Sequence, residues 1–307
     1  MATNLTSAYG GDNLIVSDII KDPSWLPERI LTNLDRAFLE EALFRNGGTN
    51  DGVVAYREAA AQFLNDDAAE VAEFGEIPVS DLNIGKAKTL VGIKTALAVR
   101  VSREMIRENK IDMVSRQTTA LQNTMVKSGV DASLAAFDAA DVPELAATAG
   151  WEDDAANPVR DILAAKRMVN TAKAPNRDDA LMGYRATTLL VAPGVMDLAL
   201  WHESTQKFYN GNAAVENPLY LGVTPQTLAG LRVVESVWLP EGTAWVMESG
   251  TAGFISDTDP LTVSPLYEEG GQSGHGGPRQ SWRTDAFRKR IIAVDNPGAV
   301  VKITGIA

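Results

Sequence analysis

The sequence predicts an α+β protein, and two observations carry that prediction. Between Asp51 and Phe137, a long charged β-hairpin leads directly into a long helix. From Pro143 to the C-terminus, short helices and short strands alternate. Segments with the two-residue period of strands and segments with the period of helices therefore occur together in one chain, which is typical of a mixed fold.

Length and composition limit the number of domains and the kinds of site that the chain can form. The 307 residues could form one large domain or two, and 45% apolar with 22% charged residues is ordinary for a globular protein. The net charge of −12 argues against wholesale binding to nucleic acid. The chain has no cysteine, which excludes disulfides, zinc–thiolate sites and iron–sulfur clusters. We expect neither a signal peptide nor a membrane span, since the chain lacks an apolar run of about 18 residues.

The N-terminal residues 1–34 have no clear period and are expected to form an extended arm. Trp25 and Leu26, between two prolines, are its apolar contact point. The segment 35–45 predicts an amphipathic helix that begins at Asp35 and ends at the glycine pair Gly47-Gly48.

The hairpin has one acidic and one basic arm. No lysine or arginine lies between Arg57 and Lys86. The return arm, residues 86–101, alternates apolar residues with lysines, which predicts a strand whose lysine face is wet. A lone two-stranded hairpin is marginal in water, so each arm is expected to lie on a neighbouring copy of opposite charge. The acidic residues are Glu58, Asp66, Asp67, Glu70, Glu73, Glu76 and Asp81, and the basic ones begin with Lys86, Lys88 and Lys94.

The helix that follows is expected to lie on a surface or a sheet, because its apolar stripe is narrow and contains small and polar residues. Gly129 is a possible bend, and Pro143 marks the end. The stripe is Ile111, Val114, Thr118, Leu121, Met125, Ser128 and Ala132.

The second block begins with a helix capped by Asn157-Pro158, which buries Val159, Ile162, Leu163 and Val169. A buried strand at 187–192 precedes a short helix that ends near Trp201. Further strands are expected at 231–238, 243–247, 253–255, 287–294 and 299–303, with a glycine-rich loop at 270–277.

No catalytic, cofactor-binding or metal-binding residue is predicted. His202 is interpreted as a surface or half-buried residue and His275 as part of the flexible loop. Gly271 to Gly276 differs from a nucleophile elbow, and no phosphate-binding glycine motif occurs. The acidic run 152–154 is interpreted as a solvated face.

The order of parts (an arm, an extended hairpin, a long helix, a compact block and a closing strand pair) resembles the major capsid proteins of tailed double-stranded DNA bacteriophages, with the Hong Kong 97-like fold. Local phrases are similar to those of phages of actinobacterial hosts. They are Phe74-Gly75-Glu76-Ile77-Pro78-Val79-Ser80, Val101-Ser102-Arg103-Glu104-Met105-Ile106, Ala192-Pro193-Gly194, Thr227-Leu228-Ala229-Gly230-Leu231-Arg232-Val233-Val234 and Asp285-Ala286-Phe287-Arg288-Lys289-Arg290-Ile291.

The resemblance implies a domain plan. Residues 1–50 would be the N-terminal arm and 51–99 the extended loop. Residues 100–142, with the spine helix, and 256–295 would form the peripheral domain. Residues 143–255 and 296–307 would form the axial domain.

The resemblance also implies partners. Copies would form hexamers and pentamers and close into an icosahedral shell around double-stranded DNA. A separate scaffolding protein, a portal and a decoration protein are expected, with no membrane and no cofactor. The chain would belong to the virion after assembly in the host bacterial cytoplasm.

The candidate assembly contacts are Trp25, Leu26, Lys86, Lys88, Lys94, Glu70, Glu73, Glu76, Arg288 and Arg290. Arg288 and Arg290 are interpreted as a small ion-pair patch between subunits. Two alternatives stay open: an encapsulin-type bacterial compartment shell, and an acidic hydrolase that uses carboxylates alone.

Overall fold

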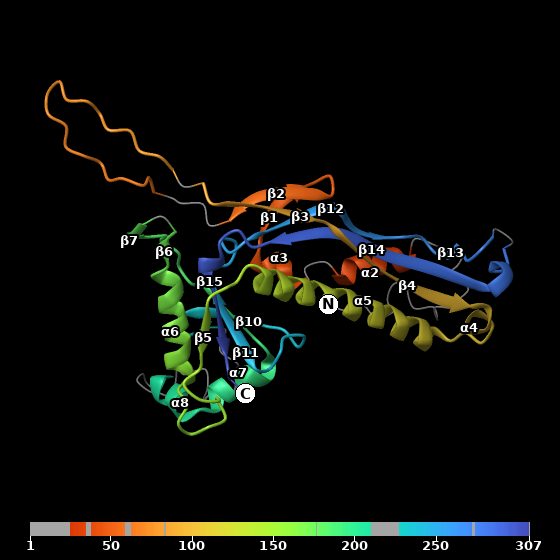
Figure 1. Ribbon diagram of the computed structural model, residues 1–307. Helices are drawn as coiled ribbons and strands as arrows, with labels where there is room; N and C mark the ends of the chain where they lie inside the picture. Colours follow the sequence, from red (N-terminus) through yellow and green to blue (C-terminus); the bar gives the residue numbers. More distant parts are fainter. Residues whose placement is uncertain are drawn as a thin grey trace.

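The computed structural model describes residues 25–34, 38–58, 63–82, 84–175, 177–209, 227–271 and 274–306. In these ranges the chain forms two main sheets with helices packed against them, which confirms the α+β prediction (Figure 1). A five-stranded sheet and a long helix extend toward one end of the molecule, and a six-stranded sheet with shorter helices forms the other part.

The five-stranded sheet is built around β14 (Ser281–Ala293). It pairs antiparallel with β12 (Phe254–Val263) on one side and with β4 (Ile93–Ser102) on the other. Two short strands complete the sheet: β1 (Arg45–Thr49), parallel to β12, and β13 (Tyr267–Glu268), antiparallel to β14. The strands β12 and β14 are longer than predicted. The ladder with β4 keeps polar residues of β14 such as Thr284 in the extended conformation, and β14 in turn pairs with β12 from Phe254 to Val263.

Helix α5 (Ile111–Ala139) runs beside this sheet and confirms the predicted long helix, which ends before Pro143 (Figure 1). Val114, Thr118, Leu121 and Met125 are buried as predicted. After Met125 the buried residues are Gly129, Val130, Ser133 and Phe137, whereas Ala132 is exposed and Ser128 half-buried. The predicted stripe advanced every 3.5 residues, and a straight α-helix with 3.6 residues per turn drifts away from such a stripe.

The six-stranded sheet has the order β5-β15-β11-β8-β10-β9. The strands are β5 (Glu144–Ala146), β15 (Val300–Thr304), β11 (Thr243–Met247), β8 (Thr188–Val191), β10 (Leu231–Glu235) and β9 (Thr227–Leu228). Several short elements surround the two sheets. They are helices α4 (Arg103–Arg107), α7 (Pro193–Trp201) and α8 (Glu203–Tyr209), the strand pair β6 (Lys173–Ala174) and β7 (Arg177–Leu181), and the short turns η2 (Gly277–Arg279) and η3 (Pro297–Ala299).

Helix α6 (Pro158–Asn170) packs against β15 and β11. Its predicted cap is confirmed, because the side chain of Asn157 accepts a hydrogen bond from the backbone N–H of Arg160 at 3.0 Å. Three of the four predicted core residues are buried, but Leu163 is exposed. Ala165 takes the buried position on that face instead.

The N-terminal expectations were wrong in two respects. Residues Trp25–Leu34 form a helix, α2, and its Ile30 and Leu34 are fully buried, so this part is no extended arm. The predicted helix from Asp35 to Arg45 is reduced to α3 (Leu39–Leu43), and Asp35 lies outside the described residues.

The glycine pair that was expected to stop a helix lies in strand β1 beside β12. A Cβ on Gly47 would lie 2.7 Å from the ring of Phe254, so glycine lets the two strands approach closely.

The apolar core is divided into two clusters that share α5. The larger one contains the six-stranded sheet, α6, and Val130 and Phe137 of α5. The smaller one contains Ile30 of α2, the Trp282 end of β14, and the first half of α5 through Met125. The long helix thus connects the two parts of the molecule.

Candidate assembly surfaces

The predicted hairpin is confirmed at its base. Strand β2 (Val53–Glu58) pairs antiparallel with β3 (Lys86–Val91), in a register that runs from Val53 opposite Val91 to Glu58 opposite Lys86. Between these strands, the described residues 63–82 contain neither helix nor strand and project away from both sheets (Figure 1). We call residues 63–82 the projecting loop.

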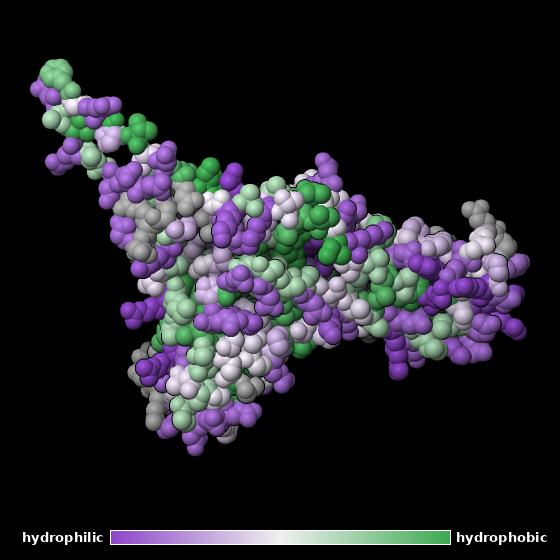
Figure 2. All heavy atoms as spheres, viewed as in Figure 1, coloured by the Kyte–Doolittle hydropathy of each residue, from purple (hydrophilic) through white to green (hydrophobic). Residues whose placement is uncertain are grey.

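The projecting loop exposes large apolar side chains that have no core of their own. Phe74 is 99% exposed, Val79 93% and Ile77 77%. Figure 2 shows apolar atoms along this loop among hydrophilic ones. Each such side chain would gain about 1.5–3 kcal/mol if it were fully buried. Adjacent apolar residues that stay exposed in a subunit mark an interaction surface.

The backbone at the loop's end holds Phe74 outward. Phe74 has a φ of 65°, in the left-handed region that bulky residues rarely adopt. The N–H of the next residue, Gly75, donates a hydrogen bond to the carbonyl of Ala72 at 2.8 Å, which closes a tight turn. A strained conformation that leaves an aromatic ring in solvent is a feature associated with binding sites.

The acidic candidates Glu70, Glu73 and Glu76 lie exposed on the projecting loop. Together with the apolar side chains they make it an acidic, partly apolar surface. Sequence reasoning missed Phe74, Ile77 and Val79 as contact residues. The signal that could have identified them is a set of large apolar residues inside an acidic stretch with no partner strand.

The three lysine candidates have different surroundings. Lys86 is exposed. Lys88 forms an ion pair with Glu58 of the opposite strand, Nζ to Oε1 2.6 Å, and this hydrogen bond raises the pKa of the lysine. Lys94 places its Nζ 4.5 Å from the ring centroid of Phe287, a cation–π contact. The hairpin therefore satisfies part of its charge internally.

The wet lysine face predicted for the return arm is confirmed at Lys86 and Lys94, which are exposed, and was wrong at Lys88. Lys88 is half-buried, whereas Ala87, Thr89 and Val91 on the opposite face are exposed. Lys88 faces the body of the subunit across a cavity lined also by Asp141, Pro175 and Pro297. Folding the lysine toward this body leaves the more apolar face of the strand uncovered.

The prediction that Arg288 and Arg290 form an ion-pair patch between subunits was wrong. Both arginines pair with acidic residues of their own subunit. The Arg288 guanidinium pairs with Glu40 of α3 at 2.7 Å and stacks on Phe38, 4.3 Å from the ring centroid. Arg290 pairs with Glu40 at 3.3 Å and with Asp257 at 2.6 Å. Arg288 is only 4% exposed and Glu40 fully buried.

Trp25 and Leu26 begin helix α2 rather than an extended arm. Their side chains lie outside the described part of the chain, so their role as assembly contacts stays a prediction.

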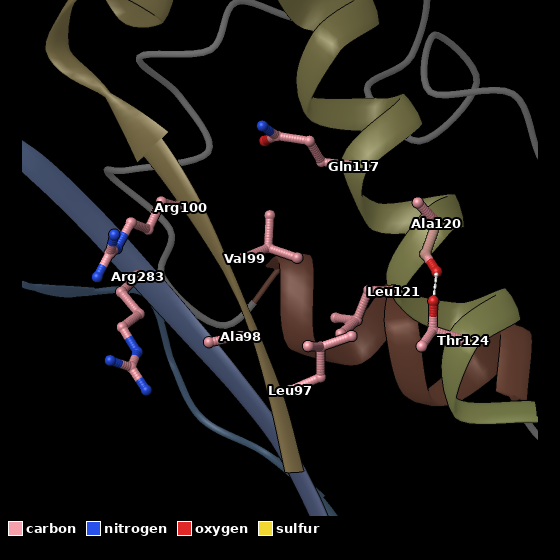
Figure 3. Close-up of a pocket in the computed structure, with 9 residues that line it drawn as sticks. All are labelled: Leu97, Ala98, Val99, Arg100, Gln117, Ala120, Leu121, Thr124 and Arg283. Atoms are coloured by element: carbon pink, nitrogen blue, oxygen red, sulfur yellow. Dashed lines mark hydrogen bonds between the residues drawn. The ribbon is translucent and has the colours of Figure 1, made fainter. Parts of the chain in front are cut away.

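A groove separates β4 from α5. It has a volume of about 510 Å³ and is lined by Leu97, Ala98, Val99 and Arg100 of β4, by Gln117, Ala120, Leu121 and Thr124 of α5, and by Arg283 (Figure 3). Figure 3 shows the side chain of Gln117 extending from α5 toward β4. Its Oε1 atom is buried and has no hydrogen-bond partner in the described part of the protein.

The described residues do not assemble a reaction centre. His202 caps its own turn, with Nδ1 2.8 Å from Ser204 Oγ and Nε2 3.2 Å from the carbonyl of Asp153. Within the described ranges, no group of three or more histidine, aspartate or glutamate residues could hold a metal ion. No helix in those ranges has the length and apolarity needed to cross a bilayer.

Comparisons with known proteins agree with this picture. A family model described as phage capsid protein matches residues 86–303. No curated protein matches the chain.

Solved structures share the fold at low sequence identity. A virus-like particle from Pyrococcus furiosus is 12% identical, with a TM-score of 0.59 over 91% of this chain and 97% of that one. A structure from Mycobacterium phage Bobi is 16% identical, with a TM-score of 0.57 over 85% of this chain and 88% of that one. One from Gordonia phage Cozz is 16% identical, with a TM-score of 0.56 over 88% and 85%.

Proposed function

Since this chain belongs to the phage capsid protein family and has the Hong Kong 97-like capsid fold, we propose that it is the major head protein, assembling through hexamers and pentamers into an icosahedral shell. The family makes it a structural rather than an enzymatic protein, and a component of the virion.

The observation that carries the proposal is the projecting loop. Phe74, Ile77 and Val79 are held in solvent at the end of a long hairpin, where they make no contribution to the core of their own subunit. A folded chain stabilises such a segment by burying it against another copy. Each copy then extends one loop and receives another, which is an arrangement that propagates around a ring.

We propose the domain plan from the two cores, although the five-stranded sheet also takes β1 from residues 1–50 and most of β4 from residues 51–99. We assign 100–142 and 256–295 to a peripheral domain, 143–255 and 296–307 to an axial domain around the ring centre, 51–99 to the extended loop and 1–50 to the N-terminal arm. The division of the core into two clusters supports this plan, because each cluster falls mainly in one domain.

The proposed contents are double-stranded DNA, held without sequence-specific contacts. A net charge of −12 suits a wall that must not adhere to the packaged polymer. A separate scaffolding protein, a portal and a decoration protein belong to the proposal as partners, as does assembly in the host bacterial cytoplasm.

A compartment shell is the second candidate, because the similar Pyrococcus furiosus structure is a virus-like particle. At 12% identity that likeness shows the fold alone, whereas the family match favours the phage head. The two differ in what they enclose.

Imaging and mass measurement of the purified full chain test the proposal. We expect closed shells, or rings of five or six subunits, when the chain is expressed alone or with an adjacent scaffold-like gene. The triple variant Phe74→Ser, Ile77→Ser and Val79→Ser should fold normally but lose these particles. Monomers or dimers from the unaltered chain under both conditions would contradict the proposal.

A further inference from the structure

Strand β4 has a free edge. Among the described strands it forms a ladder only with β14, over ten residue pairs from Ser281–Ser102 to Arg290–Ile93. Its other edge therefore carries backbone N–H and C=O groups, on alternate residues, that no strand satisfies. Such an edge is a template on which an extended segment can add as a further strand.

The groove between β4 and α5 runs along this edge. Four consecutive residues of β4, 97 to 100, line it, and β14 contributes only Arg283, so most of its strand wall is β4 itself. The opposite wall is α5, from which the unpartnered Oε1 of Gln117 extends toward β4 (Figure 3). A buried carbonyl oxygen of this kind requires an N–H donor, and the backbone of an added strand would supply one.

The chain itself contains a suitable segment. Residues 13–20 read Asn-Leu-Ile-Val-Ser-Asp-Ile-Ile, rich in the β-branched residues that favour strands. Gly10-Gly11 precede this segment and Pro23 follows it, as expected for a bounded strand.

Helix α2, which follows this segment in the sequence, packs near the groove. The described chain starts at Trp25, and Ile30 of α2 packs in the same core cluster as Leu121, which lines the groove. Five residues of helix from Trp25 to Ile30 rise about 7.5 Å. Residues 21–24 can span about 14 Å when extended. Because α2 also contacts α5, the other wall of the groove, this connection is long enough for residues 13–20 to reach the groove of their own subunit.

We propose that residues 13–20 add to the free edge of β4 in the same subunit, as a sixth strand of that sheet, and donate a backbone hydrogen bond to Gln117. This docking goes beyond the proposed function, because it takes place in the single subunit and does not depend on shell formation. It stabilises β4, the strand that joins the hairpin to the sheet.

Disulfide trapping tests the placement. The chain has no cysteine, so any disulfide must come from the introduced pair. We pair Ala98→Cys in turn with Ile15→Cys, Val16→Cys and Ser17→Cys, in the otherwise complete, unassembled chain. At least one pair should oxidise to an intramolecular disulfide, seen as faster migration without reductant. The matched control, Ala98→Cys with Thr6→Cys, should not.

Hydrogen exchange gives a second, independent readout. In the unassembled chain, Val16→Pro removes a donor and disrupts an added strand, so amides of residues 97–100 should exchange at least about tenfold faster. Thr6→Pro is the control and should leave them unchanged. Disulfide-linked dimers alone, no disulfide in any of the three pairs, or equal exchange in Val16→Pro and the unaltered chain would overturn the proposal. None of these results depends on whether shells form.

Discussion

At the scale of single residues, the buried contact among Glu40, Arg288 and Gly129 is the feature that sequence reasoning was least able to predict. Glu40 and Arg288 are separated by 248 positions along the chain, and nothing local distinguishes Arg288 from a surface arginine. Their pairing depends on how α3 packs on β14. Gly129 looked like a potential bend, whereas its role is steric: it leaves room on α5 for the two charged side chains.

Gly129→Ala should therefore destabilise the subunit although alanine favours helices by about 1 kcal/mol over glycine. The new Cβ would lie 2.6 Å from Glu40 Oε2 and 2.8 Å from Arg288 Nη2. Both side chains are buried and cannot retreat into solvent, so we expect a loss of about 1–3 kcal/mol in the free energy of unfolding. Urea unfolding of the unassembled chain measures it.

Ser128→Ala, at the neighbouring half-buried position, is the matched control and should change stability by no more than about 0.5 kcal/mol. Stabilisation by Gly129→Ala would show that the packing at this site is looser than described.

Tyr184 should make the subunit sensitive to alkaline pH. Burial, with the nearby charges of Asp295 and Glu248, raises the pKa of Tyr184 from 10.0 to about 12. The neutral phenol is therefore favoured in the folded state. Its contribution to stability is fully present below pH 10 and is lost as pH rises through about 12, by up to about 2–3 kcal/mol.

Tyr184→Phe removes this titration together with the hydrogen bond that the hydroxyl donates to Asn296 at 3.1 Å. At pH 8 the variant should be less stable by about 1 kcal/mol. Between pH 10 and 12 it should lose less stability than the unaltered chain, as followed by urea midpoints. Parallel stability curves across that range would contradict the assignment.

At the scale of elements, the sequence correctly predicted helices and strands that are determined by residues close together in the chain. The Asn157 cap predicted α6 correctly, and the apolar run at 187–192 predicted β8, because capping and burial act over a few residues. The prediction failed for residues 44–49, where β1 forms because β12 is adjacent, and where Gly47 permits that approach. The free edge of β4 is likewise a property of the assembled sheet, which no local pattern reveals.

The hairpin charges give a prediction at this scale. Reversing Lys86 and Lys94 to Glu should cost the subunit about 1 kcal/mol, because the cation–π contact of Lys94 with Phe287 is lost while the exposed charges contribute little. Assembly should require roughly tenfold more subunit, since the basic arm then repels the acidic loop of its neighbour; that factor corresponds to about 1.4 kcal/mol. Sedimentation of particles over a concentration series measures the shift.

Adding Glu70→Lys, Glu73→Lys and Glu76→Lys to this double variant restores opposite signs and should recover assembly. Lys88→Glu alone acts differently, because it faces Glu58 within the hairpin and should loosen β2 and β3 instead. Unchanged assembly in the double variant would mean that the loop's apolar side chains, and not its charges, set the contact.

At the scale of the whole molecule, the buried ion pair lies between the two cores. Phe38, on one side of Glu40 in the sequence, belongs to the smaller cluster, and Leu43, on the other side, belongs to the larger one. On α5, Met125 and Val130 divide in the same way around Gly129. A polar contact at this place separates two apolar clusters, and the long helix α5 contributes residues to both.

This arrangement predicts that the smaller core opens before the larger one. It is formed by fewer buried residues than the larger core, which surrounds a six-stranded sheet. Regions with fewer buried apolar contacts open at lower free energy. In hydrogen exchange of the unassembled chain, amides of α2 and β4 should therefore exchange well before those of β8 and β11.

Arg288→Met should widen this difference. It leaves the Glu40 carboxylate buried with only Arg290 nearby, a change that costs about 3–5 kcal/mol where a buried pair is broken. Because the lost contact lies at the junction, we expect exchange to accelerate most in α2, α3 and the first half of α5, with β8 and β11 least affected. An equal acceleration in all elements would show that the two clusters unfold as a single cooperative unit.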